Sequence, residues 1–375
     1  MVGSALPRVS ATVILAKPAL QRIFDHLCES GFQLIGPTVR DGAIVLDSIR
    51  NLSELPAGWA LEQKAGSSRL LRTHATDYFA FTVGPHSWKR YLFPPQVEML
   101  TARRNGNGWV FEPTIDDTPP FAFIGVRSCD LHAIAIQDDV FVNGSVRDPH
   151  YAHRRERAFI LAVNCSTVAS TCFCTSMNTG PRARSGFDLV LTELPDSFAI
   201  EIGSEAGSNV FAGIDWQPAS AFDVGRVSQI TQRTERQITR QVTTSDLPQL
   251  LYNRIDHPYW DKLAARCLSC ANCTLVCPTC FCSTVEDSSN LSGTHTKRTR
   301  LWDSCFILDF SHVHGGNIRP TTKSRFRQWM THKLAAWIEQ FGRSGCVGCG
   351  RCIAWCPVGI DITEELSALR SLGAR

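Results

Sequence analysis

The chain reads Cys267-Leu-Ser-Cys270-Ala-Asn-Cys273-Thr-Leu-Val-Cys277-Pro278 in one place and Cys346-Val-Gly-Cys349-Gly-Arg-Cys352-Ile-Ala-Trp-Cys356-Pro357 in another. Both stretches, called here the first and second ladder, have the bacterial ferredoxin spacing C-x2-C-x2-C-x3-C-P. In that pattern three cysteines wrap one cubane, and the fourth points away and ligates the neighbouring cubane. The spacing therefore predicts two [4Fe–4S] clusters with crossed ligands: Cys267, Cys270, Cys273 and Cys356 for the first, and Cys346, Cys349, Cys352 and Cys277 for the second.

Zinc sites and disulfides explain this pattern less well. A structural zinc site is closed by four ligands, and two ladders with eight thiolates and two Cys-Pro ends exceed that need. Disulfide frameworks belong to short secreted chains, whereas this chain has 375 residues and 16 cysteines. Nearly all of those cysteines gather in two regions, which is typical of metal sites in a reducing compartment.

Composition and charge narrow the class of protein further. The net charge of +3 is too small to indicate binding to nucleic acid or to a membrane surface. The first 20 residues lack the basic region and apolar stretch of a secretory signal, and no twin-arginine motif opens the chain. Apolar runs are far shorter than the ~20 residues that span a bilayer. We therefore expect a cytoplasmic protein with neither nucleic acid nor membrane as a partner.

Four further cysteines follow a predicted strand–helix–strand unit. Residues 121–126 and 158–163 are short, apolar runs that predict buried strands, with helical character between them. Strands joined in this way are normally parallel, and open α/β sheets bind ligands at the carboxyl ends of such strands. Cys129 and Cys165 follow those ends, and Cys172 and Cys174 lie in the same loop. We predict a third iron–sulfur cluster held by these four; the alternative is a set of buried or reactive free thiols.

The whole chain is predicted to be an α/β N-terminal domain followed by an α-helical ferredoxin domain that carries two [4Fe–4S] clusters. The predicted parts are residues 1–215, with the possible extra cluster site, a linker and helix over 216–258, and the dicluster domain over 259–375. The helical reading rests on apolar residues spaced three and four apart between the ladders: Phe326, Trp329, Met330, Leu334, Trp337, Ile338 and Phe341. Thr321 or Thr322 can begin this helix and Gly342 can end it. Its aromatic side chains are interpreted as core packing.

Several other residues have two interpretations each. Cys28, on a predicted helix over 18–28, is interpreted as a small core residue. The basic and aromatic stretch over 83–95 is interpreted as a solvated turn, and otherwise as a contact to a partner or an anionic cofactor. Arg351 either raises a cluster potential or is solvated, and Gly348 and Gly350 are expected to bring the backbone close to the cluster sulfurs.

A second group of cysteines surrounds the first ladder. Thr279-Cys280-Phe281-Cys282 repeats Thr171-Cys172-Phe173-Cys174, and Cys305 lies in Trp302-Asp-Ser-Cys305. They are interpreted as thiols whose S–H groups tune a cluster. The alternative is another metal site that takes a fourth ligand from His312 or His314.

Common substrate-handling motifs are missing from the sequence. It contains neither G-x-G-x-x-G after a strand nor G-x-x-x-x-G-K-[ST], and neither H-E-x-x-H nor G-x-S-x-G. The sequence therefore predicts electron transfer without substrate chemistry of its own.

Several motifs together resemble one protein family. They are Gly125-Val-Arg-Ser-Cys129-Asp130-Leu131, Val163-Asn164-Cys165, Thr171-Cys-Phe-Cys-Thr-Ser176, Cys277-Pro-Thr-Cys-Phe-Cys282, Trp302-Asp-Ser-Cys305, Gly315-Gly316 with Arg319-Pro320, Gly345 to Cys352, and Cys356-Pro-Val-Gly-Ile-Asp361. The chain resembles the iron–sulfur (4Fe–4S dicluster) β subunit of cytosolic NAD(P)-linked [NiFe] hydrogenases, also called sulfhydrogenases, over roughly residues 85–365. The iron–sulfur subunit of anaerobic sulfite reductase, its A component, is a close relative of that family.

The resemblance implies a place in a larger complex. Its partners would be the large and small hydrogenase subunits, together with one that binds flavin and NAD(P). The chain would relay electrons among them through its clusters, and all eight ladder cysteines match the family pattern. Two alternatives remain open, namely the A component of a sulfite reductase and a freestanding ferredoxin-like carrier or redox sensor.

Overall fold

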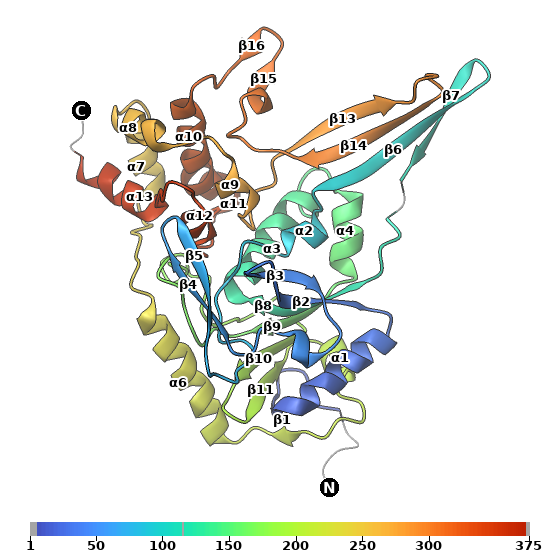
Figure 1. The fold of residues 1–375 in the computed structure, drawn as a ribbon, viewed down its shortest axis with the longest axis vertical. Helices are drawn as coiled ribbons and strands as arrows, with labels where there is room; N and C mark the ends of the chain where they lie inside the picture. Colours follow the sequence, from blue (N-terminus) through green and yellow to red (C-terminus); the bar gives the residue numbers. More distant parts are fainter. Residues whose placement is uncertain (1–5, 115, 373–375) are drawn as a thin grey trace.

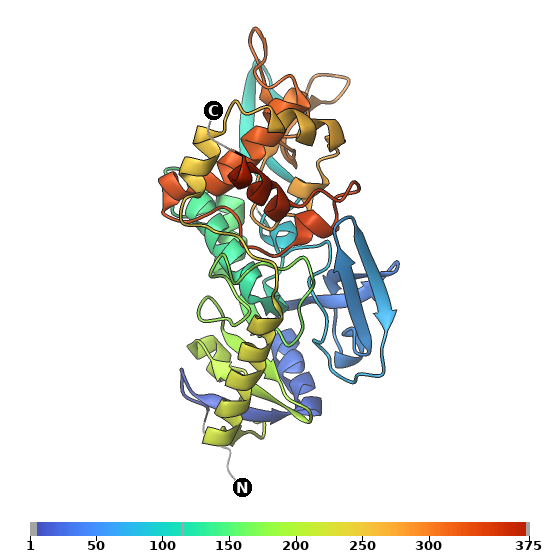
Figure 2. The same ribbon diagram turned by 90° about the vertical axis from the view of Figure 1, so that its left-hand side faces the viewer.

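A computed structural model describes residues 6–114 and 116–372 of the chain. The polypeptide builds a sheet-centred lower part, a helical upper part that contains both ladders, and an arm of four strands that projects sideways (Figure 1). Seen from the side, the helical part sits directly on the end of the sheet-centred part (Figure 2). None of the helices among these residues is long and apolar enough to cross a bilayer.

The lower part contains an eight-stranded mixed sheet. The strand order is β12 (Gln217–Pro218), β1 (Thr12–Ala16), β11 (Ser197–Ile202), β10 (Leu189–Glu193), β9 (Phe159–Val163), β8 (Phe121–Arg127), β2 (Gln33–Arg40) and β3 (Ala43–Ser48). The central strands β10, β9, β8 and β2 run parallel, and the outer pairs are antiparallel. The predicted βαβ unit is therefore present: β8, helix α3 (Ser128–Phe141) and β9.

The central strands are buried on both faces, which explains their continuous apolar sequence. Residues of α1 (Leu20–Glu29) pack on one face with Ala122 and Ile124 of β8. Residues of α3 and α4 (Pro149–Glu156) pack on the other face with Phe121 and Phe123. The remaining elements of this part are the hairpin β4–β5 (Trp59–Lys64 and Ser67–Arg72), α2 (Lys89–Leu92), α5 (Glu205–Asn209) and the long α6 (Ala221–Gln237).

The upper part is built from short helices around a core shared with cysteines of both ladders. They are α7 (Leu247–Asn253), α8 (Tyr259–Arg266), α9 (Asn272–Leu275), α12 (Arg351–Ala354), α13 (Ile362–Ser371) and the helix between the ladders. That last helix consists of α10 (Thr322–Thr331), one π-helical turn (His332–Ala336) and α11 (Trp337–Phe341). The Thr321 side chain accepts from the backbone N–H of Ser324 at its start, and Gly342 ends it with φ of 69°. Both predicted ends are confirmed.

The segment before that helix differs from the expectation of a largely helical insertion. It forms two hairpins, β13–β14 (Ser283–Ser289 and His295–Trp302) and β15–β16 (His312–Val313 and Gly316–Asn317). Strand β14 pairs with β6 (Gln96–Asn105), which pairs with β7 (Gly108–Pro113) to complete the arm. The arm therefore joins a hairpin that precedes the βαβ unit to one that lies between the ladders. A mixed α/β architecture describes the chain, and strands contribute to both halves.

Candidate functional site

The two ladder loops have the same backbone conformation. Ser269 and Ala271 in the first ladder have φ of 52° and 66°, and Gly348 and Gly350 occupy the same places in the second with 64° and 75°. In each loop the second residue after the first cysteine donates its backbone N–H to that cysteine's sulfur, at 3.4 Å for both Ser269 and Gly348. The positive φ turns the N–H groups inward, toward the thiols, where they stabilise negative charge on sulfur.

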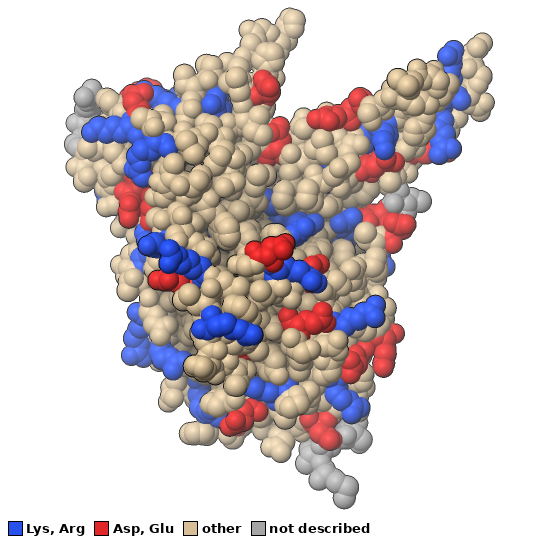
Figure 3. All heavy atoms as spheres, in the orientation of Figure 1, with Lys and Arg blue, Asp and Glu red and all other residues tan. Residues whose placement is uncertain are grey.

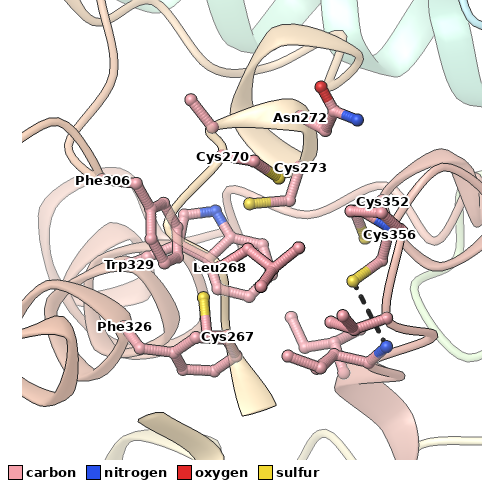
Figure 4. A pocket seen from close by; sticks show the side chains of 15 residues that line it. Cys267, Leu268, Cys270, Asn272, Cys273, Phe306, Phe326, Trp329, Cys352 and Cys356 are labelled. Atoms are coloured by element: carbon pink, nitrogen blue, oxygen red, sulfur yellow. Dashed lines mark hydrogen bonds between the residues drawn. The ribbon is translucent and has the colours of Figure 1, made fainter. Parts of the chain in front are cut away.

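Four cysteines predicted for the first cluster line one cavity. Cys267, Cys270 and Cys273 face it from the first ladder, and Cys356 faces it from the second (Figure 4). Apolar side chains, including Phe306, Phe326 and Trp329, form the rest of its wall. The backbone N–H of Ile360 donates to the Cys356 sulfur at 3.3 Å. Thiolates in an apolar wall with backbone donors match the surroundings of a protein-bound cubane.

The second predicted set also converges. Burial raises the pKa of Cys352 well above its ordinary value, and nearby Cys346, Cys349 and Cys277 raise it further. Cys352 lines the first cavity as well, so the two sets of thiols are neighbours. Among the described residues, no three His, Cys, Asp or Glu side chains form a group that could hold a single metal ion.

The third predicted set lies where the sequence placed it, just beyond the ends of β8 and β9. Burial raises the pKa of Cys174, and Cys172, Cys165 and Cys349 raise it further. Cys129 feels Cys349 and Cys174 in the same way, after burial and Asp130. The buried Arg127 uses one guanidinium nitrogen to bind the carbonyls of Phe79 and Phe81, at 2.8 and 2.9 Å. Its other terminal nitrogen is also buried and finds no acceptor within residues 6–114 and 116–372, which suits an anionic group beside these thiols.

The two Thr-Cys-Phe-Cys segments both contact the second ladder. The N–H of Phe173 donates to the carbonyl of Gly348 at 2.9 Å, and the Thr279 hydroxyl donates to the carbonyl of Gly345 at 2.7 Å. The expected approach of glycines to cluster sulfurs takes another form here. A Cβ on Gly350 would lie 2.3 Å from the Thr171 carbonyl oxygen, and one on Gly348 would lie 2.7 Å from the Phe173 backbone. These glycines let the N-terminal domain contact the ladder backbone.

A buried ion pair joins the second ladder to the βαβ unit. The two terminal guanidinium nitrogens of Arg351 donate to the two carboxylate oxygens of Asp130 at 2.8 and 3.0 Å. Both residues are 2% exposed. The solvated interpretation of Arg351 is therefore wrong, because its guanidinium lies between the carboxylate and the thiols of Cys349 and Cys129, which help to hold its charge.

Two buried lysines lie next to the thiols on the opposite side of the second ladder. Lys333 Nζ lies 3.4 Å from the Cys277 sulfur and 2.9 Å from the Thr279 hydroxyl. Burial alone would lower the pKa of Lys333, but Cys277, Cys280 and Cys346 hold it well above its ordinary value. Lys89 lies 4.1 Å above the Trp302 ring. Burial lowers its pKa, and Cys280 and Cys277 oppose that change.

The structure corrects two more interpretations. Lys89 belongs to the stretch over 83–95 that was read as a solvated turn, yet it is only 4% exposed and points into the protein. Cys28 is exposed on α1, so it is no core residue. Sequence reasoning also missed Lys333, Asp130 and Arg127 as neighbours of the thiols. Their only signal was position: Arg127 and Asp130 flank Cys129, and Lys333 lies on the aromatic helix.

Comparison with known proteins agrees with this geometry. The family model for a 4Fe-4S dicluster domain matches residues 266–360, the region that contains both ladders. The sulfhydrogenase 2 subunit beta of Pyrococcus furiosus is 32% identical over 355 residues, which cover 92% of this chain and 95% of that protein. The chain belongs to the family of sulfhydrogenase β subunits.

Membership of the sulfhydrogenase β-subunit family identifies the ladders as iron–sulfur binding. It also agrees with the resemblance that the scattered cysteine motifs indicated, and the identity extends well beyond the ladders into the sheet-centred part. No solved structure matches the chain.

Proposed function

We propose that this chain relays electrons inside a multi-subunit NAD(P)-linked [NiFe] hydrogenase and performs no substrate chemistry itself. The observation that carries the proposal is the neighbourhood of two crossed cysteine sets, each drawing three ligands from one ladder and one from the other. Since Cys352 of the second set lines the cavity of the first, clusters in the two sets would adjoin. A [4Fe–4S] cluster supplies one-electron transfer, at a potential set by charge, hydrogen bonds to sulfur and exposure.

The ligands in this proposal are the predicted ones. Cys267, Cys270, Cys273 and Cys356 hold the first [4Fe–4S] cluster, and Cys346, Cys349, Cys352 and Cys277 hold the second. The residues present suit this role, because the thiols line shared spaces, backbone N–H groups point at them, and Arg351 and Lys333 supply positive charge nearby.

A third cluster at Cys129, Cys165, Cys172 and Cys174 belongs to the same proposal. Its support is the convergence of four thiols, their contact with Cys349 of the second ladder, and the unpartnered nitrogen of Arg127 among the described residues. A cluster there would extend the relay from the ladders to the end of the eight-stranded sheet. The same division of the chain, with an α/β domain over 1–215, a linker over 216–258 and the dicluster domain over 259–375, fits this path.

The partners in this proposal are the large and small hydrogenase subunits and a flavin- and NAD(P)-binding one, in the cytoplasm. Two alternatives remain, the A component of anaerobic sulfite reductase and a freestanding carrier. The relative's printed name, which is that of a sulfhydrogenase component, favours the hydrogenase over both. On the face seen in Figure 3, basic and acidic side chains are interspersed without a single-sign patch, which suits contact with other proteins better than contact with a polyanion.

Anaerobic purification of the tagged chain from its source cells tests the proposal. Co-purifying nickel with hydrogen-dependent dye reduction is the expected result. Sirohaem without nickel would move the chain to sulfite reduction, and a chain that purifies alone with its iron would support the freestanding carrier.

A ligand variant tests the cluster assignment. Cys349→Ser should remove the signal of the second cluster and block electron transfer, while far-ultraviolet circular dichroism of the eight-stranded sheet stays native. Cys28→Ser, which changes an exposed thiol on α1, is the matched control and should leave every cluster signal intact. Intact signals for both ladder clusters in Cys349→Ser would refute the assignment.

A further inference from the structure

Three cysteines outside the ladders line a second cavity. Cys280, Cys282 and Cys305 share the wall of a space of about 400 Å3. Cys280 and Cys282 follow the first ladder directly, and Cys305 follows β14. The N–H of Asp303 donates to the Cys282 carbonyl at 2.9 Å, which fixes the two segments side by side. All three thiols are half-buried.

The other polar side chains of this cavity favour a negatively charged occupant. Lys333, which is 6% exposed, lines it together with Arg319 and His332, and no Asp or Glu is among its described lining residues. Trp329 lines both this cavity and the first; its indole N–H is buried and meets no acceptor in the described part of the chain. Buried cations and orphaned donors need an anionic partner, and three thiolates on an iron–sulfur group supply one.

The position of this cavity repeats that of the proposed third cluster. Each Thr-Cys-Phe-Cys segment contacts the second ladder through its own hydrogen bond, Phe173 to Gly348 and Thr279 to Gly345. Each also has a buried cation between its thiols and the ladder, Arg351 near Cys129 and Lys333 near Cys280. Two sequence repeats thus place two thiol groups on opposite flanks of one ladder.

From this arrangement we propose that Cys280, Cys282 and Cys305 hold a further iron–sulfur centre, in addition to those of the proposed function. Three thiolates leave the fourth iron position of a cubane without a cysteine. His332 faces that position from the cavity wall. Burial lowers the pKa of His332, and Lys333 and Arg319 lower it further, so its imidazole is neutral near pH 7 and can ligate iron. His312 and His314 instead lie exposed on the β15–β16 hairpin.

Protection from alkylation tests the proposal without any substitution. The anaerobically purified holoprotein, with its partners, is treated with iodoacetamide and mapped by mass spectrometry, before and after iron chelation. Cys280, Cys282 and Cys305 should be protected in the holoprotein and become labelled after chelation, while exposed Cys28 is labelled in both. Free labelling of the three thiols in iron-loaded protein would overturn the proposal.

A double variant measures the iron itself. Cys282→Ser with Cys305→Ser avoids Cys280, which adjoins the ladder ligand Cys277. The variant should lose about four iron and four sulfide per chain, while the spectra of the ladder clusters persist. An unchanged iron content would overturn the proposal, as would loss of one zinc instead of iron, or loss of the ladder signals together with the iron. None of these results depends on whether nickel subunits co-purify, so the proposed function is tested separately.

Discussion

At the scale of single residues, the chain surrounds its thiols with buried positive charges, each of which is held differently. Arg351 is paired with a carboxylate, whereas Lys333 contacts neutral oxygens and a thiol. A buried charge left without a partner is costly. The two residues should therefore respond differently to substitution: one change should affect mainly stability, and the other mainly redox potential.

Asp130→Asn should destabilise the protein by about 3 kcal/mol, because it leaves the Arg351 guanidinium buried without its carboxylate. The midpoint of anaerobic urea unfolding measures the effect. Asp261→Asn is the control, since Asp261 is 61% exposed in its pair with Lys323, and it should cost less than about 1 kcal/mol. Equal effects of the two variants would show that the buried pair contributes nothing special.

Lys333→Met should make the second cluster harder to reduce, because reduction adds negative charge next to a site that has lost its cation. We expect the potential to fall by on the order of 60 mV, which corresponds to ~1.4 kcal/mol for a one-electron couple. Potentiometric titration followed by electron paramagnetic resonance measures it. Lys262→Met, on the exposed face of α8, should leave the potential unchanged. A rise in potential in Lys333→Met would contradict the electrostatic account.

At the scale of elements, the ladder loops are also docking surfaces. The same left-handed turn occurs with Ala271 in one ladder and with Gly350 in the other. The first ladder shows that this backbone tolerates a methyl group. In the second, the Thr171 carbonyl occupies the space where that methyl group would lie.

Gly350→Ala should therefore destabilise the contact between the second ladder and the loop of Thr171, at a cost of about 1–3 kcal/mol from the steric clash. Hydrogen exchange of the loop over 169–179 should accelerate in this variant. Ala271→Gly is the converse change in the equivalent turn, and it should leave that loop's exchange unaltered. If both variants leave the loop protected, the close approach at Gly350 does not stabilise the contact.

Elements with a strong local pattern could be predicted from the sequence, and elements made by distant pairing could not. The ladders, the βαβ unit and the aromatic helix each carry their own spacing or periodicity, and each lies where it was expected. The arm depends on β6 pairing with β14, and no local pattern encodes that partner. Lys89 was misread for the same reason: the carbonyls of Thr274 and Leu275 that receive its ammonium group lie far along the chain.

At the scale of the whole molecule, the thiols are part of the core. Cysteines of both ladders pack with Trp260, Phe306 and Met330 in one apolar cluster. The eight-stranded sheet has separate cores formed by its own strands and helices. Metal loading should therefore affect the two parts of the chain unequally.

Removal of iron with an anaerobic chelator should loosen the helical part first. Limited proteolysis of the apoprotein should cleave within residues 266–360, while a fragment that contains the eight-stranded sheet survives. The same digestion of the iron-loaded protein is the control and should leave the ladders uncut. Simultaneous loss of both parts would show that the sheet depends on the metal as strongly as the helices do.

The four-stranded arm has a consequence for how ribosomes make this protein. Ala102 of β6 is paired with Thr296 of β14, roughly 200 positions later. At ~5–20 residues per second of synthesis, the β6–β7 hairpin emerges tens of seconds before its neighbour exists. During that interval the nascent hairpin exposes an unpaired edge beside Trp109 and Phe111, and open edges of this kind recruit other chains. The growing polypeptide therefore needs a chaperone or a dilute environment until its second hairpin is translated.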